Sequence, residues 1–178
     1  MPSIYLIRHE EPELRGRFIG RTDPPLTAAG QRSAVAKLAG LEFAAIYVSP
    51  LRRARQTAGA IGGGVTPVVI PELAEIDFGE WEGFTWQEIQ ERWPNAACRK
   101  VEDWLGVTTP GGESWIDFCA RVDRALDTIL AGPMPTAVVA HMVVNSAIAA
   151  RLLGSDPKQF RQDYGEILTC EAPHHPQI

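Results

Sequence analysis

The strongest constraint on the fold is an alternation of short apolar runs with segments of helical periodicity. Apolar runs typical of buried strands occupy residues 4–7, 43–48, 67–70, 137–140 and 167–169. Helices are predicted from Thr27, from Ser49-Pro50 to the glycines at 62–64, over 113–131, and from His141 to Leu153. This alternation predicts an α/β fold with three layers, in which helices cover both faces of a mostly parallel central sheet.

The length of 178 residues fits one domain, so we predict a single domain over residues 1–178. Residues 78–115 break the alternation, because they contain all five tryptophans and no convincing strand. We expect this segment to form a cap that packs over one end of the sheet. The tryptophans are expected to build the small core of the cap rather than a platform for a ligand.

Charge and composition argue against several classes of function. The 22 acidic residues outnumber the 17 basic ones and no basic block occurs, which disfavours a nucleic-acid partner. Because the sequence shows no cationic leader and no apolar run long enough for a bilayer, we expect a cytoplasmic protein without a membrane partner. The three cysteines lack a paired spacing and are interpreted as reduced thiols, and His174-His175 as an exposed tail rather than a metal site. The chain is expected to be a monomer or a homodimer.

Candidate functional side chains follow three of the predicted strands. Arg8 and His9 follow the first, Arg53 lies in the helix after the second, and His141 follows the apolar run at 137–140. Ligands of open α/β sheets bind beyond the carboxyl ends of the strands, where these side chains would converge. Arginines and helix N-termini favour an anion, and the sequence therefore predicts a pocket for a small-molecule phosphate ester. The same cations would neutralise phosphate, so we expect no metal and no cofactor.

A histidine in such a pocket can attack phosphorus, because a nearby guanidinium lowers the pKa of the imidazole and keeps it neutral. A second histidine can donate a hydrogen bond to the phosphoryl oxygens. Residue chemistry alone does not select the proton donor among five acids, which are Glu72, Glu75, Asp77, Glu80 and Glu82. Each feature also has an ordinary structural interpretation: a strand-end turn, a core histidine, a solvated helix face or a solvated loop.

Six segments together resemble the histidine phosphatase superfamily, the phosphoglycerate-mutase-like group. They are YLIRHEE (5–11), GRTDPPLT (20–27), SPLRRARQTA (49–58), LAEIDFGEWEG (73–83), PGGES (110–114) and VVAH (138–141). The resemblance implies a phosphoglycerate-mutase-like fold, in which His9 is phosphorylated and Glu75 donates the proton. It further implies that the phosphoryl oxygens are held by Arg8, Arg53 and His141. The substrate-binding residues that we predict are Arg8, Arg17, Gly20, Arg21, Arg53 and Met142.

Two positions depart from the family pattern. Glu10 stands where the family has a glycine after the first histidine, and this glycine allows a close backbone approach. The carboxylate of Glu10 is therefore expected to alter the local geometry or to place a negative charge near the phosphate. Met142 stands where a Gly-Gly pair is usual after the second histidine, so we expect a narrower pocket.

The resemblance implies a metal-independent phosphomonoesterase, of the histidine acid phosphatase type, that works through a phosphohistidine. The short length and the motifs are most similar to the small α-ribazole phosphatase and broad-specificity branch, so α-ribazole 5'-phosphate is one candidate substrate. Two alternatives remain open at this point. In the first alternative the chain is a phosphoglycerate-type mutase. In the second it is a catalytically dead module that binds a phosphorylated ligand.

Overall fold

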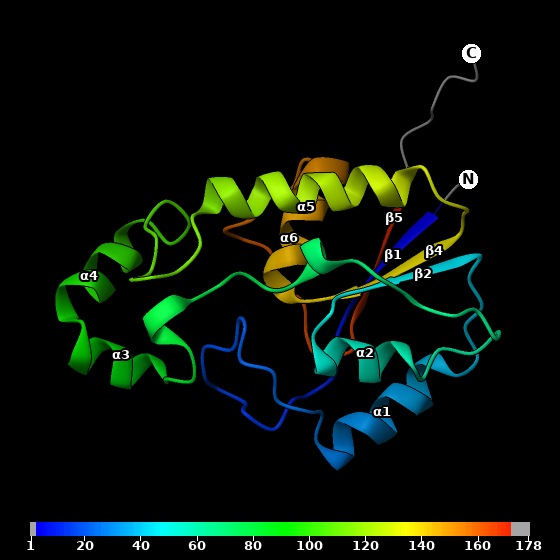
Figure 1. The fold of residues 1–178 in the computed structure, drawn as a ribbon, viewed down its shortest axis with the longest axis horizontal. Coiled ribbons are helices and arrows are strands. Elements are labelled where there is room, and N and C mark those ends of the chain that lie inside the picture. The colour runs from blue at the N-terminus through cyan, green and yellow to red at the C-terminus, as the bar shows by residue number, and fades with distance from the viewer. Residues whose placement is uncertain (1–2, 172–178) are drawn as a thin grey trace.

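The computed structural model describes residues 3–171, so the two histidines of the C-terminal tail lie outside the described residues. A five-stranded sheet forms the centre of the molecule, in the order β3-β2-β4-β1-β5 (Figure 1). Its strands are β1 (Ser3–Arg8), β2 (Ala45–Val48), β3 (Val68–Val69), β4 (Thr136–Ala140) and β5 (Ile167–Glu171). Only β5 runs antiparallel to its neighbour, so the prediction of a mostly parallel sheet is confirmed.

The register of the sheet brings three strand ends together. Arg8 at the end of β1 pairs with Ala140 at the end of β4, and Val48 at the end of β2 pairs with Val139. Because these strands are parallel neighbours, the residues that follow them leave the sheet at the same edge. At this edge of the sheet therefore lie His9, Ser49 and His141.

Four helices cover the two faces of the sheet. Helices α5 (Trp115–Leu130) and α6 (Met142–Leu153) lie on one face, and α1 (Ala28–Leu38) and α2 (Arg52–Ala58) lie on the other (Figure 1). Each face has its own apolar core, the first around Phe118 and Ile148 and the second around Leu38 and Ile46. The predicted three-layer α/β architecture is thus confirmed. Among residues 3–171, no helix combines the length and the apolar character that crossing a bilayer would require.

Two local predictions are wrong at the start and at the end of α2. Ser49 does not cap the helix, since α2 begins at Arg52 and the Ser49 hydroxyl lies 2.7 Å from Nε2 of His141. The helix also ends at Ala58, before the glycines at 62–64. Of the glycines that follow, Gly62 passes close to the residue after α1, since a Cβ on it would lie 2.2 Å from the carbonyl oxygen of Ala39.

The segment from 78 to 115 contains no strand, as predicted. After the short 3₁₀ turns η1 (Pro71–Leu73) and η2 (Gly79–Trp81), it forms α3 (Trp86–Arg92) and α4 (Pro94–Glu102). These two helices lie beyond one end of the sheet (Figure 1), and we call residues 78–115 the cap. Trp81, Ile89 and Ala97 are buried together there, with further aromatic rings around them.

Candidate active site

A cavity of about 320 Å³ opens between the edge of the sheet and the cap. Five side chains from the sheet side of this cavity carry polar, sulfur or aromatic groups: Arg8, His9, Glu75, Met142 and Tyr164. The cap and the loop before α1 supply most of the remaining wall. The volume is that of a small-molecule site.

His9 is held in one tautomer. Its Nδ1 lies 2.7 Å from the carbonyl oxygen of Glu10, and because a carbonyl only accepts, Nδ1 carries the hydrogen. Its Nε2 accepts a hydrogen bond of 3.3 Å from Nε of Arg53, so this nitrogen bears the lone pair. Burial, followed by the charge of Arg53, lowers the pKa of His9 to about 3. The ring is therefore neutral at pH 7 and has a nucleophilic nitrogen.

His141 lies directly beside His9, with the two ring centroids 5.1 Å apart. The hydroxyl of Ser49 accepts from the amide of Leu51 and lies 2.7 Å from Nε2 of His141. When this hydroxyl donates to Nε2, the ring hydrogen of His141 is on Nδ1. This Nδ1 is buried and has no hydrogen-bond partner among residues 3–171. Burial, then the charge of Arg53, lowers the pKa of His141 well below its ordinary value. His141 is thus a neutral ring close to His9, and in the tautomer with hydrogen on Nδ1 it offers an unpaired donor there.

Arg53 is completely buried and ties His9 to the loop before α1. Beside its contact with His9, its guanidinium donates to the carbonyl oxygens of Ile19, Gly20 and Thr22 at 2.8 to 3.0 Å. The carboxylate of Asp23 lies 3.7 Å away. Burial lowers the pKa of Arg53, whereas nearby acids oppose this effect, and an arginine keeps its charge in proteins. A permanent cation therefore stands beside Nε2 of His9.

Arg8 packs on the ring of Tyr164, a residue that was not predicted from the sequence to belong to the site. Its guanidinium carbon lies 4.0 Å from the centre of the Tyr164 ring, and that ring is also 5.7 Å from the ring of His9. One terminal nitrogen of Arg8 donates to the carbonyl of Gln162, while its buried Nε has no partner among the described residues. Tyr164 precedes Gly165, which has a φ of 67°. A glycine typical of a turn was the only feature of the sequence that distinguished this position.

Glu75 is the one acid of the five candidates that lines the cavity. Its Oε1 accepts from the amide of Ile76 at 3.0 Å and its Oε2 from the amide of Val143 at 3.2 Å. The side chain is 7% exposed, and this burial raises the pKa of Glu75 against the opposing hydrogen bonds and arginine charges. A carboxyl group with a raised pKa keeps its proton to a higher pH than an ordinary glutamate and can act as a general acid.

Three of the other acids bind parts of the chain outside the cavity. Glu82 accepts from the backbone amides of 20, 21, 22 and 78, Asp77 accepts from the amide of Gly79, and Glu80 accepts from the indole of Trp93. Glu72 is half-buried and contributes its carbonyl oxygen to Arg121.

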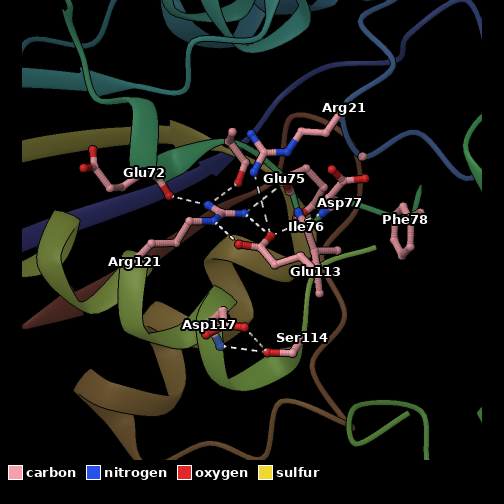
Figure 2. A network of polar contacts seen from close by, with 12 residues as sticks. Arg21, Glu72, Glu75, Ile76, Asp77, Phe78, Glu113, Ser114, Asp117 and Arg121 are labelled. Atoms are coloured by element: carbon pink, nitrogen blue, oxygen red, sulfur yellow. Dashed lines mark hydrogen bonds and ion pairs between the residues drawn. The ribbon is translucent and has the colours of Figure 1, made fainter. Parts of the chain in front are cut away.

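The segment that carries Glu75 is clamped by Arg121 of α5, as Figure 2 shows. The guanidinium of Arg121 donates to the carbonyl oxygens of Glu72, Ala74 and Glu75. It also makes two hydrogen bonds, of 2.6 and 2.8 Å, to the carboxylate of Glu113. Burial by itself would raise the pKa of Glu113, but the hydrogen bonds and charge of Arg121 outweigh it and lower this pKa. The clamp therefore fixes the backbone on which Glu75 stands.

The predicted binding residues separate into two groups. Arg17 and Met142 line the cavity, and Met142 Sδ lies 3.9 Å from Arg8. Gly20, Arg21 and Arg53 are not among the residues that line it, nor is His141, so contact of these four with a substrate stays a prediction. A Cβ on Gly20 would lie 2.0 Å from the carbonyl oxygen of Ile76, so this glycine allows close packing, whereas the exposed Arg21 lies 3.8 Å from Glu113.

Glu10 does not place its charge in the cavity. Its carboxylate lies 2.8 Å from the hydroxyl of Ser33 and 2.8 Å from the ammonium of Lys37, both on α1. Glu10 is also absent from the residues that line the cavity. The carboxylate of Glu10 is therefore bound by side chains of α1, and its charge does not face the cavity.

The cap contributes more to the cavity than the sequence indicated. Trp81 lies in the small core of the cap as expected, but Trp86, Trp104 and Trp115 line the cavity, which corrects the prediction that the tryptophans serve only that core. Lys100 of α4 also lines the cavity and was not singled out from the sequence. Its position four residues before Trp104, within the tryptophan-rich segment, was the available signal.

The family model described as histidine phosphatase superfamily (branch 1) matches residues 4–172. A bifunctional protein of Mycobacterium tuberculosis is 39% identical over 137 residues, and the match covers 72% of this chain but only 37% of that protein. Phosphoserine phosphatase 1 of Hydrogenobacter thermophilus is 34% identical, with coverage of 90% of this chain and 80% of that protein. The structure of the α-ribazole phosphatase of Shigella flexneri superposes with a TM-score of 0.83 at 28% identity, covering 94% of this chain and 89% of the other.

Proposed function

This chain belongs to the histidine phosphatase superfamily, and from that premise we propose that it is a phosphoric monoester hydrolase that works through a phosphohistidine at His9. The observation that carries the proposal is the state of His9. Its Nδ1–H is bound to the carbonyl of Glu10 and its Nε2 bears a lone pair beside the Arg53 guanidinium. A neutral, oriented imidazole next to a fixed cation is the arrangement that attack on an anionic phosphate requires.

In the first step, Nε2 of His9 attacks phosphorus in line with the ester oxygen. The N–P bond forms, the P–O bond to the alcohol breaks, and Glu75 gives its proton to the departing alcohol oxygen. The phosphoryl oxygens replace Nε2 as the acceptor for Nε of Arg53. Arg8 and Nδ1–H of His141 supply further donors while negative charge builds on these oxygens.

In the second step, the carboxylate of Glu75 takes a proton from a water molecule. The water oxygen attacks phosphorus, the N–P bond breaks, and inorganic phosphate leaves with His9 again neutral. Glu75 regains its proton, so the cycle closes without a net change in the protein. Two arginines and a histidine donor neutralise the phosphoryl charge in this scheme, which gives a metal ion no necessary part.

The substrate that we propose is a small-molecule phosphate ester whose alcohol is aromatic or largely apolar. The cavity wall beyond His9 supports this choice, because it contains Phe18, Trp86, Trp104 and Trp115. The α-ribazole phosphatase relative supplies one candidate of this class, α-ribazole 5'-phosphate, whose alcohol carries an aromatic base. We also propose that residues 1–178 act as one domain, with the cap as its substrate-facing excursion.

The test is a rapid-quench experiment with ³²P-labelled 4-nitrophenyl phosphate, run with and without EDTA. The wild-type protein is expected to release inorganic phosphate and to carry label that is stable in alkali and labile in acid. The His9→Ala variant should show neither, while circular dichroism reports that it is folded. Label retained in His9→Ala, or activity abolished by EDTA, would overturn the proposal. Phosphate binding without label indicates a dead module, and transfer between phosphoglycerate positions without release indicates a mutase.

A further inference from the structure

Lys100 is a buried cation in the cap wall of the cavity. It lies on α4, its residue is only 6% exposed, and it lines the same cavity as His9 and Glu75. Its ammonium donates one hydrogen bond to the carbonyl oxygen of Val107 and lies 5.6 Å from the centre of the Trp104 ring. These contacts leave the ammonium without an anionic partner of its own.

Unlike the charged groups around it, Lys100 forms no ion pair with any residue between 3 and 171. Among residues 3–171, no carboxylate oxygen lies within 4 Å of its ammonium. Asp103 acts on it from further away, but the Asp103 carboxylate is paired with Lys158 at 3.1 Å. Burial lowers the pKa of Lys100, as expected for an ammonium group that has lost water without gaining a counter-ion.

The other ionised groups on this side of the cavity are already paired. Arg17 lies 3.0 Å from the carboxylate of Glu88, and Glu113 is held by Arg121. Burying an ammonium ion without a partner is unfavourable, so a protein that keeps one in a cavity wall gains from an anion placed there. Lys100 is therefore the position on the cap side at which a ligand anion would be most stabilised.

The cap wall of the cavity is aromatic beside this cation, since Trp104 lies next to Lys100 and contacts two further rings. The ring of Trp86 lies 5.7 Å from that of Trp104, and Phe18 lies 6.1 and 6.2 Å from these two indoles. The cavity lining thus combines the cationic Arg8 on the sheet side with aromatic side chains and a second cationic group, Lys100, on the cap side. A ligand that matches this lining has an anion for each of the two cations and an apolar body.

We propose that Lys100 binds a carboxylate at the end of the substrate remote from the phosphate. The substrate class is then a phosphate monoester of an aromatic or apolar alcohol that carries one carboxylate, a class that does not include α-ribazole 5'-phosphate. A single ammonium group balances one negative charge, which matches a carboxylate better than a second phosphate. This inference rests on the proposed function, since it assigns the leaving-group end of the same cavity.

The test compares two esters of the same shape, 4-(carboxymethyl)phenyl phosphate and 4-(carbamoylmethyl)phenyl phosphate. The second replaces the carboxylate by a neutral amide and leaves the phenol almost unchanged as a leaving group. The wild-type protein is expected to hydrolyse the acid with a kcat/KM about tenfold higher than that of the amide, as one charge-assisted hydrogen bond would give. The preference should lie in KM, because the contact is the same in the ground state and the transition state.

In Lys100→Met the ratio of the two kcat/KM values is expected to fall to about one. The ratio is its own control, since a general loss of folding or of chemistry lowers both rates alike. Lys158→Met is the matched variant, because it removes an exposed lysine that pairs with Asp103, and it should keep the wild-type ratio.

Equal hydrolysis of both esters by the wild type, or an unchanged ratio in Lys100→Met, overturns the carboxylate site and leaves the proposed function standing. Failure to hydrolyse either ester overturns the proposed function, and the carboxylate site falls with it.

Discussion

Arg53 donates a hydrogen bond of 3.3 Å from its Nε to Nε2 of His9, and this contact sets the chemistry of the ring. The two residues are 44 positions apart in the sequence and meet because β1 and β2 both neighbour β4. The guanidinium keeps the proton off Nε2, while the carbonyl of Glu10 holds the other proton on Nδ1. The nucleophilic nitrogen is thereby chosen before any substrate arrives.

His9 is expected to remain a neutral, Nδ1-protonated imidazole from pH 8 down to pH 5. The reason is that burial and Arg53 lower its pKa to about 3, so it gains a second proton only far below this range. Nitrogen-15 chemical shifts of the histidine rings measure both the tautomer and the titration. The His9→Gln variant identifies the resonance. A midpoint near the ordinary histidine value of about 6.5, or an Nε2–H tautomer, would contradict the structure.

Activity is expected to be high in acid and to decline on the alkaline side. His9 must be unprotonated, a condition met above about pH 3, whereas Glu75 must be protonated and its pKa is raised by burial. The rate therefore falls as pH rises through the pKa of Glu75. In Glu75→Gln, kcat for an alkyl phosphate should fall by about 10² to 10³-fold and the alkaline limb should vanish.

The same variant should affect 4-nitrophenyl phosphate much less, because its leaving group needs no proton. Glu80→Gln is the matched control, since Glu80 is exposed and binds the indole of Trp93 outside the cavity. Equal losses for both esters in Glu75→Gln would exclude Glu75 as the proton donor.

Arg121→Met is expected to destabilise the protein and to mimic, in weaker form, the loss of Glu75. The substitution leaves the carboxylate of Glu113, whose side chain is 15% exposed, with only the more distant Arg21 as a cation and should lower the free energy of unfolding by about 3 kcal/mol. It also releases the carbonyl oxygens of Ala74 and Glu75. Urea unfolding measures the first effect.

The ratio of rates on alkyl and 4-nitrophenyl phosphates measures the effect of Arg121 on the position of Glu75. A purely structural role would lower both rates together, whereas a positioning role lowers the alkyl rate more. Arg124→Met lies on the same helix at an exposed site and should change neither quantity.

Glu10→Gln is expected to keep the wild-type rate within about twofold, although residue 10 directly follows the nucleophile. The carboxylate contacts Ser33 and Lys37 on α1 rather than the cavity. Loss of the ion pair with the half-exposed Lys37 should cost up to about 1 kcal/mol of unfolding free energy. Steady-state kinetics and urea unfolding together check this, and a rate change above tenfold would show that the charge of Glu10 does reach the phosphate.

The order of strands and helices could be predicted from the sequence, because the burial of each element produces a local pattern of apolar residues. Runs such as residues 137–140 are apolar throughout since β4 is buried on both faces, and Thr27 and Ser114 cap α1 and α5 through bonds to amides three residues ahead. For the same reason the grouping of Arg8, His9 and His141 followed from the rule for parallel strand ends.

Predictions from local sequence patterns were wrong where a side chain has a partner that is far away in the sequence. Ser49 has the sequence of a helix cap, yet its hydroxyl binds His141, 92 residues away. Trp86 and Trp104 fit a small core by composition, yet they line the cavity. A hydroxyl can accept from a backbone amide and donate to a ring nitrogen at the same time, so a local capping pattern does not reveal the long-range partner.

The sequence by itself determined the α/β architecture, the cationic strand ends and, through its motifs, the family. Only the tertiary structure separated Glu75 from four neighbouring acids on physical grounds, turned Glu10 toward α1, and placed Tyr164 and Lys100 in the cavity. The physical reason is range: strand and helix periodicity is set by residues a few positions apart, whereas burial, tautomer and pKa are set by contacts tens of residues apart.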